Sequence, residues 1–252
     1  MSHKTIHQQR QTSKRVCIAC VALLFMASIA HAMEFEVRGT AVLMSGPVTG
    51  IELRVLESIL TSNPSITTVV LKNSTGGDAR TGYAVGEFIR ERGLNTALSG
   101  YCISSCSRMF LGGKERRYSD DQPLEKTFVG FHGNYADNGS LLSASMGYLK
   151  DWVIKYSDNK VNPDLVEQWV HIPNHHGYAA FYHRDAKVLP GSQKVMLCQG
   201  TEERGKRQEQ CAKPEMGDAL ANGIVTTWDV LQIRALGAGA APVATNEQGE
   251  QR

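Results

Sequence analysis

The sequence has no run of basic residues, and its charges are nearly balanced. Its 252 residues include 27 Lys and Arg and 25 Asp and Glu. Residues 1–32 hold four of the basic residues and none of the acidic ones, which leaves 23 against 25 in residues 33–252, a formal charge of −2. Proteins that bind nucleic acid present clustered Lys and Arg, so we expect no nucleic-acid partner.

Long apolar runs are also missing. The main apolar stretch, residues 16–29, is short for a bilayer span. Basic residues precede it, and Ala30-His31-Ala32 follows it as an A-x-A cleavage pattern. This combination predicts a secretory signal peptide over residues 1–32, with an uncleaved membrane anchor as the alternative. We therefore expect an exported protein, periplasmic or secreted.

Cysteine is scarce, and two of the six cysteines lie in the N-terminal apolar stretch. The other four are Cys102, Cys106, Cys198 and Cys211, and neither close pair has the C-x-x-C spacing typical of structural zinc. Four cysteines in an exported protein can form two disulfides in three pairings. We expect the local pairing, Cys102 with Cys106 and Cys198 with Cys211. The second bond would close the polar loop 199–210.

A histidine cluster is the other pattern that could suggest a metal. His171, His175, His176 and His183 lie close together in the sequence. Pro173 interrupts any helix that would place His171 and His175 on one face. We interpret the cluster as an exposed histidine-rich loop, and we expect neither a metal nor a cofactor.

Repeats of the solenoid type are absent, and strand and helix patterns alternate instead. The apolar run 66–71 ends at a Gly-rich turn, and a helical pattern then extends to Gly93. An extended piece, 95–99, leads into a Ser-rich turn. This order predicts an α/β fold with parallel strands. In such folds catalytic groups and ligands collect at the carboxyl ends of strands, where loops meet helix N-termini.

The composition suits one sizeable globular domain, which we place at residues 33–234. Residues 216–231 are expected to form a helix, a turn at 222–223 and a last short helix. The Ala- and Gly-rich residues 235–252 are expected to be a disordered tail.

Two turns of the α/β region carry a resemblance to a known family. NSTGG (73–77), followed by SSCS (104–107) and FLGG (110–113), resembles the Clp protease proteolytic subunit and signal-peptide-peptidase-like serine peptidases. These proteins share the ClpP/crotonase fold, a spiral of ββα units. In them an Asn-Ser-Pro-Gly-Gly turn supplies an oxyanion donor, and a Ser-(small)-Gly-(small) turn carries the nucleophile. Here Thr75 replaces the proline and Cys106 replaces the glycine.

The resemblance implies a Ser-His-Asp arrangement. It places the nucleophile at Ser104, with Ser105 as the alternative, because Cys106 then occupies the family's glycine position. A serine hydroxyl needs a base to take its proton, and His132, at the end of a short apolar run, has the family's context for that base. Arg184-Asp185 resembles the family's Arg-Asp pair, so Asp185 is expected to orient the imidazole.

Other carboxylates and the oxyanion donors complete the predicted site. Asp164 and Asp137 are alternatives to Asp185 as the acid. The backbone N–H groups of Gly77 and Ser105 are the expected oxyanion donors. A glycine at position 77 allows the close backbone approach that such a donor needs.

The resulting hypothesis is an exported serine peptidase that cleaves peptide or protein substrates through an acyl-enzyme. The Clp subunit works with a cytoplasmic ATPase, which an exported protein would not meet, so we expect ATP-independent activity and no ATPase partner. The resemblance also implies a homo-oligomer. One alternative is a non-catalytic binding protein of the cell envelope. The other is a crotonase-type enzyme acting on acyl thioesters, which export argues against.

Overall fold

A computed structural model describes residues 32–188 and 194–236 of the chain. The predicted signal peptide and C-terminal tail therefore lie outside the described residues, apart from Ala32, Ala235 and Leu236. Within the described ranges, no helix is both long enough and apolar enough to cross a bilayer.

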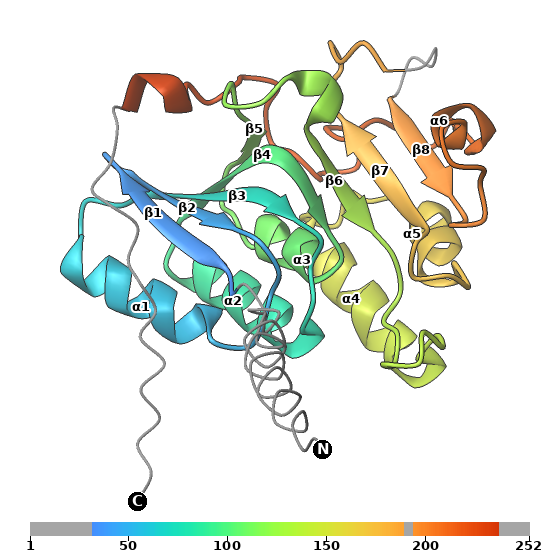
Figure 1. The fold of residues 1–252 in the computed structure, drawn as a ribbon, viewed down its shortest axis with the longest axis horizontal. Coiled ribbons are helices and arrows are strands. Elements are labelled where there is room, and N and C mark those ends of the chain that lie inside the picture. The colour runs from blue at the N-terminus through green and yellow to red at the C-terminus, as the bar shows by residue number, and fades with distance from the viewer. Residues whose placement is uncertain (1–31, 189–193, 237–252) are drawn as a thin grey trace, which may run out of the picture. The chain divides into compact units, whose positions relative to one another are not determined.

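In the described part of the chain, eight strands form one mixed sheet in the order β1-β2-β3-β4-β6-β7-β8, with β5 beside β4 (Figure 1). The strands from β2 to β6 are parallel, whereas β1 and the pair β7 and β8 run antiparallel to their neighbours. Their bounds are β1 Glu34–Arg38, β2 Ala41–Ser45, β3 Thr68–Ser74, β4 Asn95–Ile103, β5 Arg116–Tyr118, β6 Phe128–Phe131, β7 Tyr178–Tyr182 and β8 Val195–Cys198.

Helices connect the parallel strands and cover one face of the sheet (Figure 1). They are α1 Glu52–Ser62, α2 Ala79–Glu91, α3 Ser105–Leu111, α4 Met146–Tyr156 and α5 Pro163–Val170. The short α6 Arg207–Gln210 follows β8, and 3-10 turns lie at Leu124–Lys126, Ser143–Ser145 and Ile233–Leu236. The order β2-α1-β3-α2-β4-α3 confirms the predicted α/β fold with parallel strands. Alternate strand residues supply the main core, because successive side chains point to opposite faces of a sheet.

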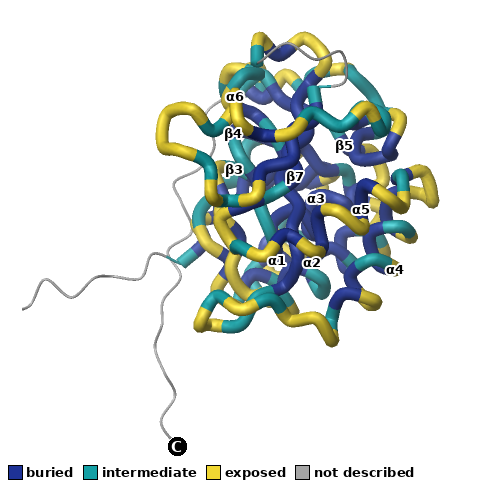
Figure 2. The backbone as a smooth tube through the Cα atoms, turned by 90° about the vertical axis from the view of Figure 1, so that its right-hand side faces the viewer, coloured by how far each residue is buried: buried dark blue, intermediate teal, exposed yellow. Residues whose placement is uncertain are grey.

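The opposite face of the sheet is covered in two different ways. Over β2 to β4, the returning C-terminal segment places Ile233 on Ala41, Leu43 and Val70. Over β6 to β8, a separate cluster around Tyr182 forms the surface. Figure 2 shows that the backbone is buried along β7 and α3, while the loop near α6 is largely exposed.

No helix forms within the segment 216–231, where helices were predicted, but the predicted turn at 222–223 is present. This segment consists of turns and bends. Gly217 and Gly223 adopt φ values of +91° and +62°, in the left-handed region, which interrupts a right-handed helix at both points. The Asp218 carboxylate accepts hydrogen bonds from the N–H groups of Leu220 and Ala221 and so stabilises a local turn.

Candidate active site

The two predicted turns meet at the carboxyl ends of β3 and β4. These strands are parallel neighbours, so the residues that follow them lie at the same edge of the sheet. Gly76 has φ +85°, and a Cβ there would lie 2.5 Å from the Ile103 carbonyl oxygen and 2.7 Å from Ser104 Cβ. The turn 73–77 can therefore contact the turn around Ser104 only with glycine at position 76.

Ser104 occupies a strained position between β4 and α3. Its φ and ψ are 61° and −126°, a combination that non-glycine residues rarely adopt. Its N–H donates to the Gly130 carbonyl at 3.0 Å, and its carbonyl accepts from Ser107 Oγ at 2.6 Å. The Cys102–Cys106 disulfide, with 5.3 Å between the Cα atoms, spans the same turn. Hydrogen bonds and a covalent bond together fix the position of the serine.

His132 follows β6 and lines the same cavity as Ser104 and Gly77, about 250 Å³ in volume. The imidazole is buried, with 7% of the residue exposed. Its Nδ1–H donates to the Gly133 carbonyl at 2.7 Å, which assigns the unprotonated nitrogen to Nε2, the form that can accept a proton. Among the described residues no hydrogen bond joins Ser104 Oγ to His132.

The surroundings of His132 favour the neutral imidazole. Burial lowers the pKa of His132 from its ordinary value to about 4, and electrostatic interactions with Arg108 and His175 act in the same direction. The hydrogen bond to Gly133 opposes this shift. His132 is therefore unprotonated, and able to act as a base, across the neutral pH range.

Arg108 is a buried cation behind the site that the sequence analysis did not identify. It is 2% exposed, lies four residues after Ser104 on α3, and its guanidinium lies 4.8 Å from the centre of the Tyr83 ring. Nη2 donates to Asn134 Oδ1 at 2.6 Å, whereas Nε and Nη1 have no hydrogen-bond partner. Within the described residues no carboxylate pairs with it. Burial accordingly lowers the pKa of Arg108.

Two backbone N–H groups have the character of oxyanion donors. Neither Gly77 nor Ser105 uses its N–H in a backbone hydrogen bond within the described residues. Gly77 lines the cavity that contains Ser104, and Ser105 is the first residue of α3, whose N–H has no partner inside the helix. Gly77 has φ +150°, and a Cβ there would lie 2.1 Å from the Val48 carbonyl oxygen. Glycine is thus required for this turn to pass Val48.

The structure does not bring Asp185 to His132. β6 and β7 are antiparallel, with Phe131 opposite Ala179 and Phe128 opposite Tyr182. His132 therefore lies beyond one end of this strand pair and Asp185 beyond the other. The Asp185 side chain is 67% exposed and lies 3.6 Å from Nδ1 of His183. The Gly133 carbonyl, and not Asp185, is the group that holds the His132 ring.

The two alternative carboxylates are also not bonded to His132. Asp164 is exposed in the first turn of α5. Asp137 lines the cavity with Ser104 and His132, but no ion pair or hydrogen bond joins its side chain to His132 in the described part of the chain. Ser104 and His132 therefore share a cavity in which a backbone carbonyl, and no carboxylate of the described residues, orients the imidazole.

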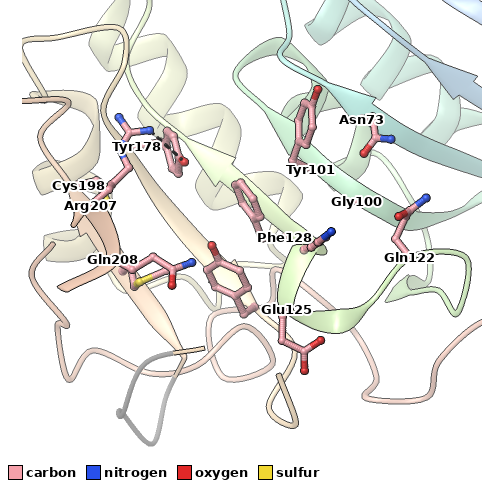
Figure 3. A pocket seen from close by; sticks show the side chains of 13 residues that line it. Asn73, Gly100, Tyr101, Gln122, Glu125, Phe128, Tyr178, Cys198, Arg207 and Gln208 are labelled. Carbon is pink, nitrogen blue, oxygen red and sulfur yellow. Dashed lines mark hydrogen bonds between the residues drawn. The ribbon is translucent and has the colours of Figure 1, made fainter. Parts of the chain in front are cut away.

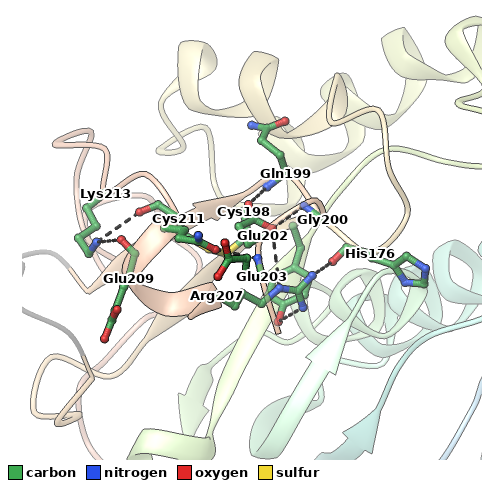
Figure 4. The surroundings of a disulfide bond; sticks show 12 residues. His176, Cys198, Gln199, Gly200, Glu202, Glu203, Arg207, Glu209, Cys211 and Lys213 are labelled. Carbon is green, nitrogen blue, oxygen red and sulfur yellow. Dashed lines mark hydrogen bonds and ion pairs between the residues drawn. A yellow bond between two sulfur atoms is a disulfide. The ribbon is translucent and has the colours of Figure 1, made fainter. Parts of the chain in front are cut away.

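The predicted local disulfides are both present, and the second defines a loop beside the site. Cys198 and Cys211 are joined, and the enclosed loop carries Glu202, whose carboxylate accepts from the N–H groups of Gln199 and Gly200 (Figure 4). Arg207 on the same loop donates to the His176 carbonyl.

The described residues contain one cluster of metal-type ligands, formed by Cys198, Glu202 and Cys211. Because the two sulfurs are bonded to each other, they are not thiolate ligands. The predicted histidine cluster is divided. His175 and His176 line the cavity next to His132, while His183 is buried and its Nε2–H donates to the Trp228 carbonyl.

Comparison with solved structures finds similar folds at low sequence identity. A mutant of ClpP1 from Listeria monocytogenes aligns with a TM-score of 0.46 and 11% identity, covering 78% of this chain and 94% of that chain. A mutant of the 1510-N membrane-bound stomatin-specific protease aligns with a TM-score of 0.43 and 12% identity, covering 73% and 75%. No family model and no curated protein matches the sequence. The chain is similar to these proteins in fold alone.

Proposed function

We propose that this protein is an exported serine peptidase that cleaves peptide bonds with Ser104 as nucleophile and His132 as general base. The observation that carries the proposal is one cavity lined by Ser104, His132 and Gly77. These residues supply a serine on a strained turn and, as far as the described residues extend, an imidazole with Nε2 free and a backbone N–H without a partner. Nucleophile, base and oxyanion donor are the groups that acyl transfer needs.

The reaction follows from these positions. His132 Nε2 takes the proton of Ser104 Oγ as Oγ attacks the carbonyl carbon of the peptide bond. The resulting oxyanion accepts hydrogen bonds from the N–H groups of Gly77 and Ser105. As the C–N bond breaks, His132 returns the proton to the leaving amine, which leaves an ester on Ser104. Water then attacks the ester while His132 takes its proton and transfers it back to Oγ. Throughout, the Gly133 carbonyl holds Nδ1–H.

The proposed activity is accompanied by proposals on the location of the protein, its energy requirement, its assembly and its cofactors. Two disulfides are typical of proteins in oxidising compartments, and they support a periplasmic or secreted location. Activity without ATP, assembly into a homo-oligomer and independence of a cofactor stay predictions.

A fluorophosphonate probe tests the proposal directly, because it reacts with an activated serine. We expect the full chain, with both disulfides formed, to be labelled at Ser104 on peptide mapping. Ser104→Ala and His132→Ala should lose the label. Ser105→Ala should keep it, since the Ser105 hydroxyl is buried and has no part in the proposed step. Absence of label on folded protein would contradict the proposal, and label on Ser105 would move the nucleophile by one residue.

A second function, binding of polypeptides without cleavage, is favoured by one observation. In the described structure Ser104 Oγ makes no hydrogen bond to His132, and no carboxylate orients the imidazole. A cleft with these properties can hold a peptide without reacting. In that case peptide binding would be measurable while the probe leaves Ser104 unmodified.

A further inference from the structure

The face of the sheet that α1–α5 leave uncovered carries a row of aromatic side chains near the site. Tyr101 of β4 is opposite Phe128 of β6, which is opposite Tyr182 of β7. The ring centroids are 6.5 Å and 5.0 Å apart. Tyr178 stacks on Phe128 at 5.7 Å with the ring planes 18° apart. These side chains line a cavity of about 510 Å³, here called the aromatic groove (Figure 3).

The aromatic groove is linked to the site around Ser104 by a cavity that adjoins both. It shares Tyr178 and Arg207 with a neighbouring cavity of about 1010 Å³. That cavity in turn shares Thr75, His132 and His175 with the cavity that contains Ser104. The three cavities therefore form an adjoining series, taken here as the path of a ligand from the aromatic row to the proposed nucleophile.

The strands give the length of this path. Tyr101 precedes Ser104 by three residues along β4, and Phe128 precedes His132 by four residues along β6. At the rise of an extended chain these separations are about 10 to 13 Å. An extended peptide covers the same distance with three to four residues.

The charges and polar groups around the groove do not favour a strongly charged ligand. Glu125 and Lys126 at one end have opposite signs. Arg207 lies over the Tyr178 ring at 5.1 Å, with its Nε 3.9 Å from the Glu202 carboxylate. The other lining side chains are uncharged: four aromatic rings, Met196, Cys198 and the amides of Asn73, Gln122 and Gln208. Aromatic rings contribute most when they bury apolar or aromatic groups.

We propose that the aromatic groove is a specificity subsite for an aromatic or large aliphatic side chain of an extended peptide, three to four residues from the bond cleaved at Ser104. This inference rests on the proposed function, because the position of the subsite is counted from the bond cleaved at Ser104. The groove itself needs only that a peptide binds along the path, so binding and cleavage can be tested apart.

A double-mutant cycle in the full-length Ser104→Ala protein tests the groove without turnover. The probes are a dye-labelled dodecapeptide of polar residues with one Phe and the same peptide with Ala at that position, measured by fluorescence anisotropy. We expect Tyr101→Ala to weaken binding of the Phe peptide about tenfold and to leave binding of the Ala peptide unchanged. Tyr101→Phe keeps the ring and should keep the affinity. Tyr148→Ala, which removes an exposed tyrosine outside the groove, should change neither peptide.

The outcomes separate the subsite from the catalytic proposal. Equal losses for both peptides, or no loss for either, would overturn the subsite even if the fluorophosphonate labels Ser104. The predicted coupling without labelling would support the groove and contradict the peptidase. Aromatic faces also stack on sugars, so a β-1,4-linked oligosaccharide is included. If it binds in a Tyr101-dependent way while the Phe peptide does not, the subsite proposal is wrong.

Discussion

At the scale of single residues, Ser104 combines the proposed nucleophile with an unfavourable backbone conformation. A φ of 61° with ψ of −126° is a region that only glycine enters readily. The hydrogen bonds to Gly130 and Ser107 and the Cys102–Cys106 bond hold the serine there. Placing a reactive hydroxyl at this turn therefore costs stability.

Replacing Ser104 by glycine should restore part of the stability that this backbone conformation costs. We expect Ser104→Gly to have a free energy of unfolding about 1 kcal/mol above that of Ser104→Ala, because only glycine relaxes at this φ. Both variants lack the hydroxyl, so the alanine variant is the control, and urea unfolding measures the difference. Equal stabilities would mean that the turn is not strained.

Stability should also depend on pH through His132. Its folded pKa of about 4 lies below the value of about 6.5 for an unfolded histidine, so the unfolded chain binds the proton more readily between these values. The contribution of His132 is fully present above pH 6.5 and is lost as the pH falls toward 4, a loss of about 3 kcal/mol. Unfolding curves at pH 4 to 7 should show this component in the native chain. It should be missing in His132→Gln.

Arg108 provides a way to divide the pKa shift of His132 into its causes. The guanidinium is buried, and its charge adds to the effect of burial on His132. Arg108→Gln removes the charge while its amide can still donate to Asn134, so we expect the pKa of His132 to rise. NMR titration of the His132 imidazole measures it without any need for activity. Arg108→Lys keeps the charge, so the pKa of His132 should stay low in that variant. A rise of the His132 pKa in Arg108→Lys as well would point to lost packing as the cause.

At the scale of elements, α2 and α3 lie with their backbones in contact. A Cβ on Gly82 would be 2.6 Å from the Ser105 carbonyl oxygen, and one on Gly86 would be 2.5 Å from the Arg108 carbonyl oxygen. A Cβ on Gly112 would be 2.2 Å from the Gly86 carbonyl oxygen. The helix that begins after the Gly-rich turn therefore packs on the helix that follows Ser104 only because small residues line the contact.

Gly86→Ala tests this contact. Alanine is the better helix former by about 1 kcal/mol, yet we expect the variant to be less stable by about 2 kcal/mol because the helices must separate. Gly147→Ala on α4 is the matched control, since nothing lies within 4 Å of a Cβ there, and it should not destabilise the protein. A stabilised Gly86→Ala would show that the helices are not in contact in solution.

The pairing of β6 and β7 explains which part of the site the sequence could not predict. Both segments were recognisable as short apolar strands, but their antiparallel register depends on contacts made across about 50 positions of chain. That register separates Asp185 from His132. The return of β7 beside β6 also creates the aromatic row, whose members come from three strands distant in the sequence.

At the scale of the whole molecule, the parallel half of the sheet could be predicted from local patterns in the sequence. Apolar strands, Gly- and Ser-rich turns and amphipathic helices alternate between residues 41 and 111, and parallel pairing then places both turns at one edge. His132 was within reach of the same reasoning because it follows the next parallel strand. Arg108 was not, since a charged residue on a short helix is ordinarily expected to face water. Its flanking apolar residues, Met109 and Phe110, were the available signal.

The C-terminal segment that crosses the sheet has a consequence for how the protein is made. Leu231 pairs with Ser119, and Ile233 packs on Ala41 and Leu43, which are among the first described residues to be synthesised. Contacts between such distant positions close late, because the chain must lose the entropy of a very long loop. On the ribosome, β2 and β3 would therefore wait for the residues around Ile233 before this face is covered. Until residues 231–236 are in place, the sheet face formed by Ala41, Leu43 and Val70 has no cover.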